Sequence, residues 1–278
     1  MPDLTFPPPP LPAPPPPAAP AGRRRRRRAR VGGAGRLALL VSLALVGHAL
    51  VVEPASSDPG LAPDASAYSF VGVTPDGEPF RWDPCSPIRY EVDLGTMPGS
   101  ALANVQEAVR LTGQASGLHF EFDGLVEDTS PLHIVDTMDF VSYREDGTAE
   151  WNPVLITFAP HEVFHEFHAA RALGIAFPVT SRQDYDQLVT GLIVITADVP
   201  LEPGFRSAGS LGPVVEHELG HIVGLGHVAH PLQLMFPAPL VRRWNDGDLT
   251  GLRRLGSGPC LVVPSAYAPA AAIVPVRS

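Results

Sequence analysis

The 278-residue sequence contains no lysine, and all 20 of its basic residues are arginine. Eight of these arginines precede residue 37, so the rest of the chain has twelve Arg against 28 acidic residues, a formal charge of −16. Nucleic-acid-binding domains need clustered cations on their folded surface. We therefore expect no nucleic-acid partner for the globular part.

Cysteine is also scarce, because Cys85 and Cys260 are the only two in the chain. They allow one disulfide at most, and they exclude both a cysteine-rich miniprotein and a four-cysteine zinc site. Apolar residues, by contrast, make up 45% of the sequence, which is enough to bury a sizeable core. The length fits one ordinary domain with appendages, or two small domains at most.

The N-terminal region combines a proline-rich stretch, the arginine block Arg23–Arg28 and an apolar run at 37–52. We expect residues 1–36 to form a disordered head, which the positive-inside rule leaves in the cytoplasm. The run is shorter than the ~20 residues that cross a bilayer, but a basic block before it is typical of exported proteins. Two outcomes stay open. One is a single-pass signal anchor with the globular part outside the cell, and the other is a signal peptide cleaved near Gly47-His48-Ala49.

Composition divides the rest of the chain into three parts. Residues 53–79 are rich in Pro, Ser, Asp and Gly and predict a linker. Residues 80–260 hold the periodic apolar patterns of a folded domain, and residues 261–278 form a tail.

The segment at 80–260 shows apolar patterns of both strands and helices. The predicted elements are a strand at 88–94, a helix at 100–117, strands at 118–122, 154–158 and 192–196, and helices at 213–223 and 246–255. The runs at 154–158 and 192–196 are apolar throughout, which is typical of strands covered on both faces. This order predicts an α/β (α+β) fold with a mixed sheet.

One short stretch predicts metal chemistry. His217 and His221 are four residues apart, so on a helix both imidazoles project from one face and can reach one ion. Glu218 lies beside that ion, where its carboxylate can hold and deprotonate a water molecule. Gly224 permits a left-handed turn that brings His227 back as a third ligand.

Three neutral ligands leave one coordination position open, which is the pattern of a single catalytic Zn²⁺ ion. The structural alternative for the same residues is a buried helix whose histidines are satisfied by hydrogen bonds.

This stretch resembles the HExxHxxGxxH motif of the metzincin zinc metalloproteases, and it is most similar to the matrixin-like bacterial members. Met235, in the sequence Leu234-Met235-Phe236-Pro237, resembles their Met-turn. Trp82–Tyr90 and Asp246–Leu252 are similar to the beginning and the final helix of their catalytic domains. The resemblance implies a metzincin-like domain with a mixed twisted sheet, an active-site helix, a Met-turn and a C-terminal helix. It also allows Ca²⁺, although no calcium ligands are recognisable in the sequence.

Further residues leave alternatives open. In an exported protein Cys85 and Cys260 are expected to form a disulfide, and the alternative is that Cys85 binds the zinc as a latency switch. A second HExxH motif, His161–His165, shares its helical face with His168. We interpret it as an amphipathic surface or lid helix, with a metal site as the alternative. We interpret Glu216 as a surface acid.

These observations predict a zinc-dependent metalloendopeptidase that hydrolyses peptide bonds of extracellular or cell-surface proteins. By resemblance, the strand at 192–196 would be the sheet edge that holds an extended protein or peptide substrate. Residues 37–52 would attach the protein to the membrane if they are not cleaved off. The alternative function is an exported, zinc-stabilised binding module without catalysis, and the intact Glu218 argues against it.

Overall fold

The structure is a computed structural model. It describes residues 62–127, 129–137, 139–166, 172–181, 186–262, 266, 271–274 and 276. All of these belong to one compact unit, Ala55–Ser278. The expected head at 1–36 and the apolar run at 37–52 lie outside the described residues.

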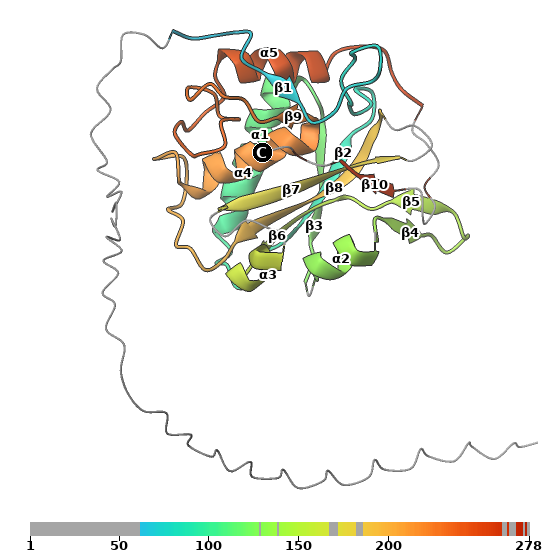
Figure 1. The fold of residues 1–278 in the computed structure, drawn as a ribbon. Coiled ribbons are helices and arrows are strands. Elements are labelled where there is room, and N and C mark those ends of the chain that lie inside the picture. Colours follow the sequence, from blue (N-terminus) through green and yellow to red (C-terminus); the bar gives the residue numbers. More distant parts are fainter. Residues whose placement is uncertain are drawn as a thin grey trace, which may run out of the picture. The chain divides into compact units, whose positions relative to one another are not determined.

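The centre of this unit is a mixed sheet of six strands in the order β10-β7-β8-β6-β2-β3 (Figure 1). The strands are β2 (Ile88–Asp93), β3 (Phe120–Leu125), β6 (Val154–Ala159), β7 (Gly174–Ser181), β8 (Leu188–Thr196) and β10 (Ala271–Ile273). Strands β3, β2, β6 and β8 are parallel, whereas β7 runs antiparallel to β8 and β10 antiparallel to β7. The predicted α/β class with a mixed sheet is confirmed.

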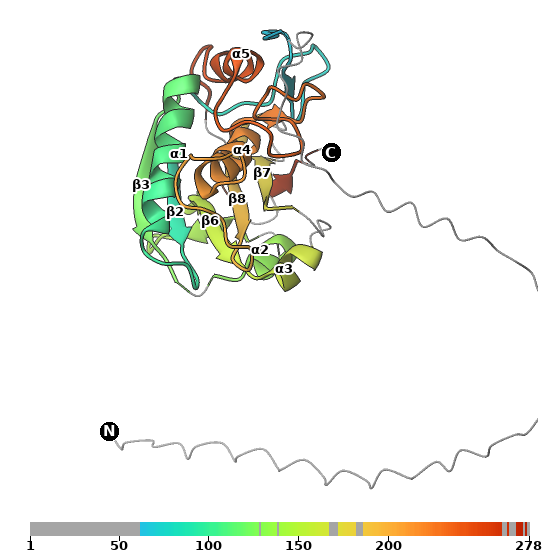
Figure 2. The same ribbon diagram turned by 90° about the vertical axis from the view of Figure 1, so that its left-hand side faces the viewer.

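Helices cover both faces of the sheet because its central strands are apolar on both sides (Figure 2). Ile193 and Ile195 of β8 belong to the core formed with α1 (Ala101–Ser116) and α4 (Leu211–Val223). Leu192 and Val194 belong to a second cluster, which packs against α2 (Pro131–Thr137) and α3 (His161–Glu166). The uninterrupted apolar runs of β6 and β8 therefore have the two-sided burial that their sequence predicted.

The helix at the end of the domain, α5 (Asp246–Leu255), begins with a capping box. The Asn245 side chain accepts a hydrogen bond from the helix backbone, and the Asp248 carboxylate accepts one from the Asn245 N–H. This arrangement satisfies donors that a helix N-terminus otherwise leaves unpaired. Helix α1 ends at Gly117, whose φ of 83° is left-handed.

Small strands extend the unit beyond the predicted limits of 80 and 260. Strand β1 (Ser69–Phe70) pairs with β9 (Leu225–Gly226), so part of the predicted linker packs onto the domain. Strand β10 adds residues of the predicted tail to the main sheet. A separate hairpin joins β4 (Val141–Tyr143) to β5 (Ala149–Trp151).

No helix in the described part of the chain is both long and apolar enough to cross a membrane. The longest one there, α1, has 16 residues and buries only one face, since Val105 and Val109 are buried while Arg110 is exposed. This finding corrects the expectation of a transmembrane helix and of a membrane partner. The apolar run at 37–52, on which that expectation rested, lies outside the described residues.

The structure also corrects the predicted role of the strand at 192–196. Strand β8 lies in the interior of the sheet, with β7 on one side and β6 on the other. Its main-chain groups are therefore paired on both sides and cannot hold an extended peptide. The antiparallel neighbour β7 lies closer to the edge and is bordered on its outer side by the short β10.

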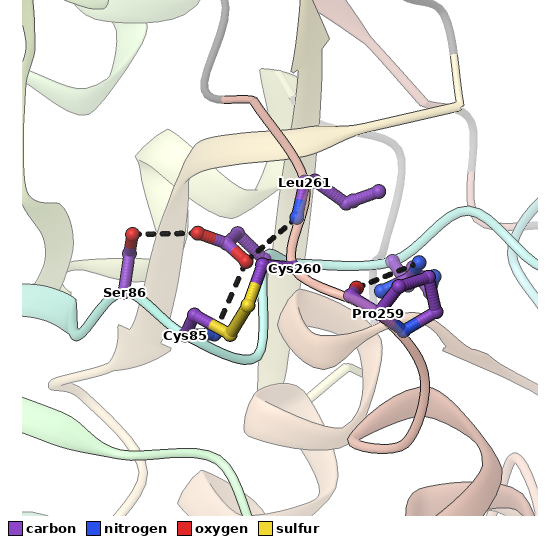
Figure 3. Close-up of a disulfide and its surroundings, with 7 residues drawn as sticks. Cys85, Ser86, Pro259, Cys260 and Leu261 are labelled. Carbon is purple, nitrogen blue, oxygen red and sulfur yellow. Dashed lines mark hydrogen bonds between the residues drawn. A yellow bond between two sulfur atoms is a disulfide. The ribbon is translucent and has the colours of Figure 1, made fainter.

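A disulfide joins Cys85 to Cys260, with 5.4 Å between their Cα atoms (Figure 3). The buried carboxylate of Asp83 lies beside it. Asp83 accepts hydrogen bonds from the N–H groups of Cys85 and Leu261 and from the Ser86 hydroxyl. The two ends of the domain are thus fastened together both covalently and by one carboxylate.

Candidate metal centre

Helix α4 places His217 and His221 one turn apart, with their rings at the wall of one cleft. His221 is buried and His217 is half-buried. The Nδ1–H of His217 donates to Leu234 O at 2.6 Å, and the Nδ1–H of His221 donates to Leu225 O at 2.8 Å. Both imidazoles therefore carry their proton on Nδ1 and present an unprotonated Nε2 to the cleft.

The third histidine reaches the same point because α4 ends at Gly224. Its φ of 119° is left-handed, and its N–H donates to the carbonyls of Gly220 and His221. A side chain there would also collide with its surroundings, because a Cβ atom would lie 2.9 Å from the Phe80 carbonyl oxygen. The chain then turns through β9 and brings His227 opposite the helix.

The three Nε2 atoms converge on one point. His227 Nε2 lies 3.1 Å from His217 Nε2 and 3.2 Å from His221 Nε2. The Nε2 atoms of both helix imidazoles carry no proton, because those protons are on Nδ1. The single proton that His227 Nε2 can carry therefore cannot make hydrogen bonds of both short contacts. Two nitrogens bound to a tetrahedral zinc ion at ~2.0–2.1 Å would lie about 3.3 Å apart. The observed separations therefore fit a shared metal ion.

The protonation states also fit a metal. Burial lowers the pKa of His217 to about 4 and holds that of His221 well below its usual value. Both rings are neutral at physiological pH, and a neutral imidazole is the form that binds metal. Imidazole is a common ligand for zinc, copper, iron and nickel, and a three-histidine set with open positions is typical of catalytic zinc.

Met235 and Leu234 contact the helix that carries His217 and His221. The Met235 side chain is buried against Gly220 of α4, where an added Cβ would lie 2.5 Å from the methionine sulfur. Leu234, the preceding residue, is the one whose carbonyl holds His217. The turn therefore contacts the helix that carries two of the histidines and orients one of their rings.

Asp248 holds this turn in place, a role that was not predicted from the sequence. Its buried carboxylate accepts hydrogen bonds from the N–H groups of Leu234 and Met235, at 2.6 and 3.3 Å. The spacing Asn245-x-x-Asp248, which marks a capping box, was the available sequence signal. It predicts the helix start but not the contact with a turn 14 residues earlier.

Glu218 lies beside the three histidines and is only 6% exposed. Burial raises the pKa of its carboxyl to about 8 in the absence of a metal. Gly174, the first residue of β7, leaves room for it, because a Cβ there would lie 2.7 Å from Glu218 Cγ. The structure thus keeps a carboxyl group that can gain or lose a proton near neutral pH next to the convergent nitrogens.

The cleft above these residues has a volume of about 640 Å³. Its walls are mostly apolar and come from the start of β7, from α4, from the segment after Met235 and from the tail. The residues that line it besides the three histidines and Glu218 are Ala172–Ala176, Ala208, Pro213, Val214, Leu234, Phe236–Pro239, Val241 and Val276.

The other candidate residues lie elsewhere. The second HExxH motif forms the short helix α3, whose His161 and Glu162 are exposed, while His168 lies outside the described residues. Glu216 is not a surface acid as expected. It is 1% exposed, its Oε2 has no hydrogen-bond partner among the described residues, and burial raises its pKa to about 8. It lies on α4 but does not line the cleft.

Fold and site together define an α/β protein with a three-histidine centre beneath an open cleft. No protein-family model matches the chain, and no curated protein has a similar sequence. Among solved structures, the chain is similar to archaemetzincin (amzA) from Methanopyrus kandleri, with 16% identity and a TM-score of 0.38. The similarity covers 62% of this chain and 96% of that one. It is too distant to assign a family, and the matrixin subtype stays a prediction.

Proposed function

We propose that this protein is a zinc-dependent metalloendopeptidase. The observation that carries the proposal is the convergence of three imidazole Nε2 atoms in an open cleft that a buried glutamate also lines. His217, His221 and His227 would hold one Zn²⁺ ion. When bound, zinc supplies a Lewis acid that polarises the scissile carbonyl and lowers the pKa of a water molecule.

Glu218 has the position and the protonation behaviour of a general base. Its carboxylate takes a proton from the attacking water and returns it to the nitrogen of the leaving amine. In the metal-free site burial favours the protonated form, with a pKa of about 8. A nearby dication favours the carboxylate and brings the pKa toward the operating pH.

The cleft fits an extended peptide. Residues Gly174 to Ala176 of β7 line the same cleft as the three histidines, so a strand placed along this part of β7 would lie in the cleft that holds the centre. Main-chain hydrogen bonds to a sheet edge hold a peptide whatever its sequence, and pockets for alternate side chains supply selectivity. The apolar walls favour substrates with apolar side chains near the cleaved bond.

The disulfide supports a site of action outside the cytoplasm. Disulfides persist in oxidising compartments and are rare in the cytosol, and Cys85 is joined to Cys260 here. We propose that the substrates are extracellular or cell-surface proteins. A binding module that used zinc only for stability would have no need of Glu218, for which Gly174 leaves space.

Replacement of Glu218 by Gln tests this function. We expect the variant to bind one zinc ion per chain and to cleave a mixed peptide library ~10²–10⁴-fold more slowly, the range in which general acid–base catalysis contributes. Glu216→Gln is the matched control, because Glu216 is buried on the same helix but does not line the cleft. It should cleave at the normal rate. A wild-type protein that binds zinc and cleaves no peptide would instead be the binding module.

A further inference from the structure

The C-terminal tail occupies one edge of the strand that borders the metal centre. Ala271, Ala272 and Ile273 pair with Ser181, Thr180 and Val179 of β7 (Figure 1). The pairing continues at Val274, whose N–H donates to Pro178 O at 2.8 Å. The Val274 side chain is 6% exposed and belongs to the main core. This is a docked strand and not a loose contact.

The direction of the tail takes it toward the catalytic residues. Because β10 is antiparallel to β7, each step forward along the tail corresponds to a step back along β7, from Pro178 toward Ala176 and Gly174. Gly174 is the residue packed against Glu218. In agreement with this direction, Val276 lines the same cleft as the three histidines and Glu218.

The sequence of β7 suits a strand whose outer edge takes a partner. The Pro178 carbonyl oxygen accepts a hydrogen bond from the Val274 N–H on the outer side of β7. The Pro178 nitrogen, which carries no hydrogen, faces the same side. Main-chain groups of alternate residues point to the same edge of an antiparallel strand, so those of Ala176 and Gly174 also face outward. An extended substrate would use these same groups, and one edge can pair with only one strand at a time.

We propose that β10, with Val274 and Val276 after it, is an autoinhibitory segment that competes with extended peptide substrates for the outer edge of β7. This inference rests on the proposed peptidase function. It assigns the substrate edge to β7 instead of β8, and it makes the tail a reversible intramolecular inhibitor that shields the approach to Glu218.

The disulfide makes this competition effective. Cys260 is bonded to Cys85, and Leu261 is hydrogen-bonded to Asp83, so the tail starts from a fixed point on the domain (Figure 3). A short tether gives an attached strand an effective concentration in the millimolar range, which is at or above typical KM values. Competition of this kind raises the apparent KM and leaves kcat unchanged.

The kinetic test uses the full chain, a chain without residues 271–278, and the single variant Val276→Asp, which places a charge in the apolar cleft. We expect both changes to lower KM on the order of 10-fold or more, with kcat within about twofold. Val262→Asp is the matched control, because this tail side chain is 89% exposed, and its KM should equal that of the full chain. An unchanged KM in both tail variants, with cleavage intact, would overturn the inference and leave the peptidase function standing.

A binding test does not depend on catalysis. A fluorescein-labelled peptide of residues 266–278 is titrated into the chain that lacks 271–278 and carries Glu218→Gln, and anisotropy is recorded. We expect saturable binding that the peptide with Val274→Pro loses by at least 10-fold, since proline removes the N–H that bonds Pro178 O. Equal binding of the two peptides, or no binding, contradicts the docked strand. Normal binding in this test, together with no cleavage of any peptide by the chain that lacks 271–278 but keeps Glu218, would reject the peptidase function instead.

Discussion

Two backbone carbonyls decide which nitrogen of each helix imidazole carries its proton. Leu234 O and Leu225 O hold the Nδ1–H groups of His217 and His221, so both Nε2 lone pairs face the cleft. Such contacts fix the orientation of a metal ligand before the metal arrives. His227 completes the set, and its nitrogen lies at about the same distance from each of the other two.

Removal of His227 should therefore weaken metal binding strongly. We expect His227→Ala to lower zinc affinity by more than ~100-fold, since even the loss of a group that only orients a ligand costs 10–100-fold. Competition with a coloured chelator measures the affinity, and elemental analysis measures the stoichiometry. His230→Ala is the control, because His230 is not part of the histidine group. Equal affinity of His227→Ala and the wild type would exclude the three-histidine site.

Asp83, which does not line the cleft, gives the protein a pH-dependent element of stability. Burial raises the pKa of the Asp83 carboxyl. Hydrogen bonds from Ser86, Leu261 and Cys85 lower this pKa by a larger amount, so the net shift is downward. A carboxyl group with a lowered folded-state pKa stabilises the fold above its unfolded-state pKa of about 4, and this contribution disappears as the pH falls through the folded value.

We expect Asp83→Asn to destabilise the protein at pH 7 by about 2 kcal/mol, the scale of hydrogen bonds to a charged group. The difference from the wild type should shrink as the pH falls below about 4, because the wild-type carboxyl then takes up its proton. Urea unfolding at several pH values between 7 and 2 measures both effects. Asp76→Asn removes an exposed charge and should leave stability nearly unchanged. A difference that stayed constant down to pH 2 would contradict the charged state of Asp83.

Among the elements, α4 shows most directly how a local stop signal builds a site. Helices α1 and α4 both end at a glycine in the left-handed region, Gly117 and Gly224. Gly117 has open space around its Cα, whereas a Cβ on Gly224 would lie 2.9 Å from both the Phe80 carbonyl oxygen and the Leu255 side chain. Gly117 and Gly224 therefore share a left-handed backbone conformation, but only Gly224 lacks room for a side chain.

Replacing each of these glycines by alanine separates the two effects. Gly117→Ala should cost ~1–2 kcal/mol of stability, the penalty of a left-handed non-glycine residue. Gly224→Ala should cost at least ~2 kcal/mol more, because backbone must move, and it should also lower zinc affinity by displacing His227. Thermal or urea unfolding and chelator competition measure the two quantities. Equal costs for the two variants would show that the crowding at Gly224 is relieved at little expense.

The elements that local sequence determines were predicted well. The helix expected at 100–117 is α1, which begins at Ala101 and ends before Gly117. The helix expected at 246–255 is α5, with its acidic first turn and basic last turn. Both have a single apolar face and a glycine directly after the last turn, and those signals lie in or next to the segment itself.

The elements that depend on neighbours were missed or misplaced. Strand β7 has no clear alternation and contains Pro178, so nothing in its sequence identified it as the strand beside the metal centre. The apolar run of β8 indicated burial on both faces correctly, but the resemblance to metzincins placed it at a sheet edge, which was wrong. Pairing order is a property of the whole sheet, and a single strand carries little of that information.

At the scale of the whole molecule, both ends of the domain pack onto elements that border the three-histidine centre. The segment before residue 80 supplies β1, which pairs with the strand just before His227. The segment after Cys260 supplies β10, which pairs with the strand that faces Glu218. Cys85 follows β1 in the sequence and Cys260 precedes β10. The disulfide between them links the segment before β2 to the start of the tail.

Loss of that disulfide should destabilise the whole unit. It joins residues separated by 175 positions, and a loop of this size loses chain entropy worth up to about 5 kcal/mol in the unfolded state. The double variant Cys85→Ser/Cys260→Ser should therefore unfold at a markedly lower urea concentration than the oxidised wild type, with a steeper dependence on urea because its unfolded chain is less compact. Reduced wild type is the matched control and should unfold with the double variant, since both lack the bond. Zinc binding below the unfolding transition should persist in all three samples, because His217 and His221 lie on α4 and His227 directly follows β9, away from both cysteines in the sequence. A double variant as stable as the oxidised wild type would show that Asp83 and its hydrogen bonds hold the two ends together without the covalent link.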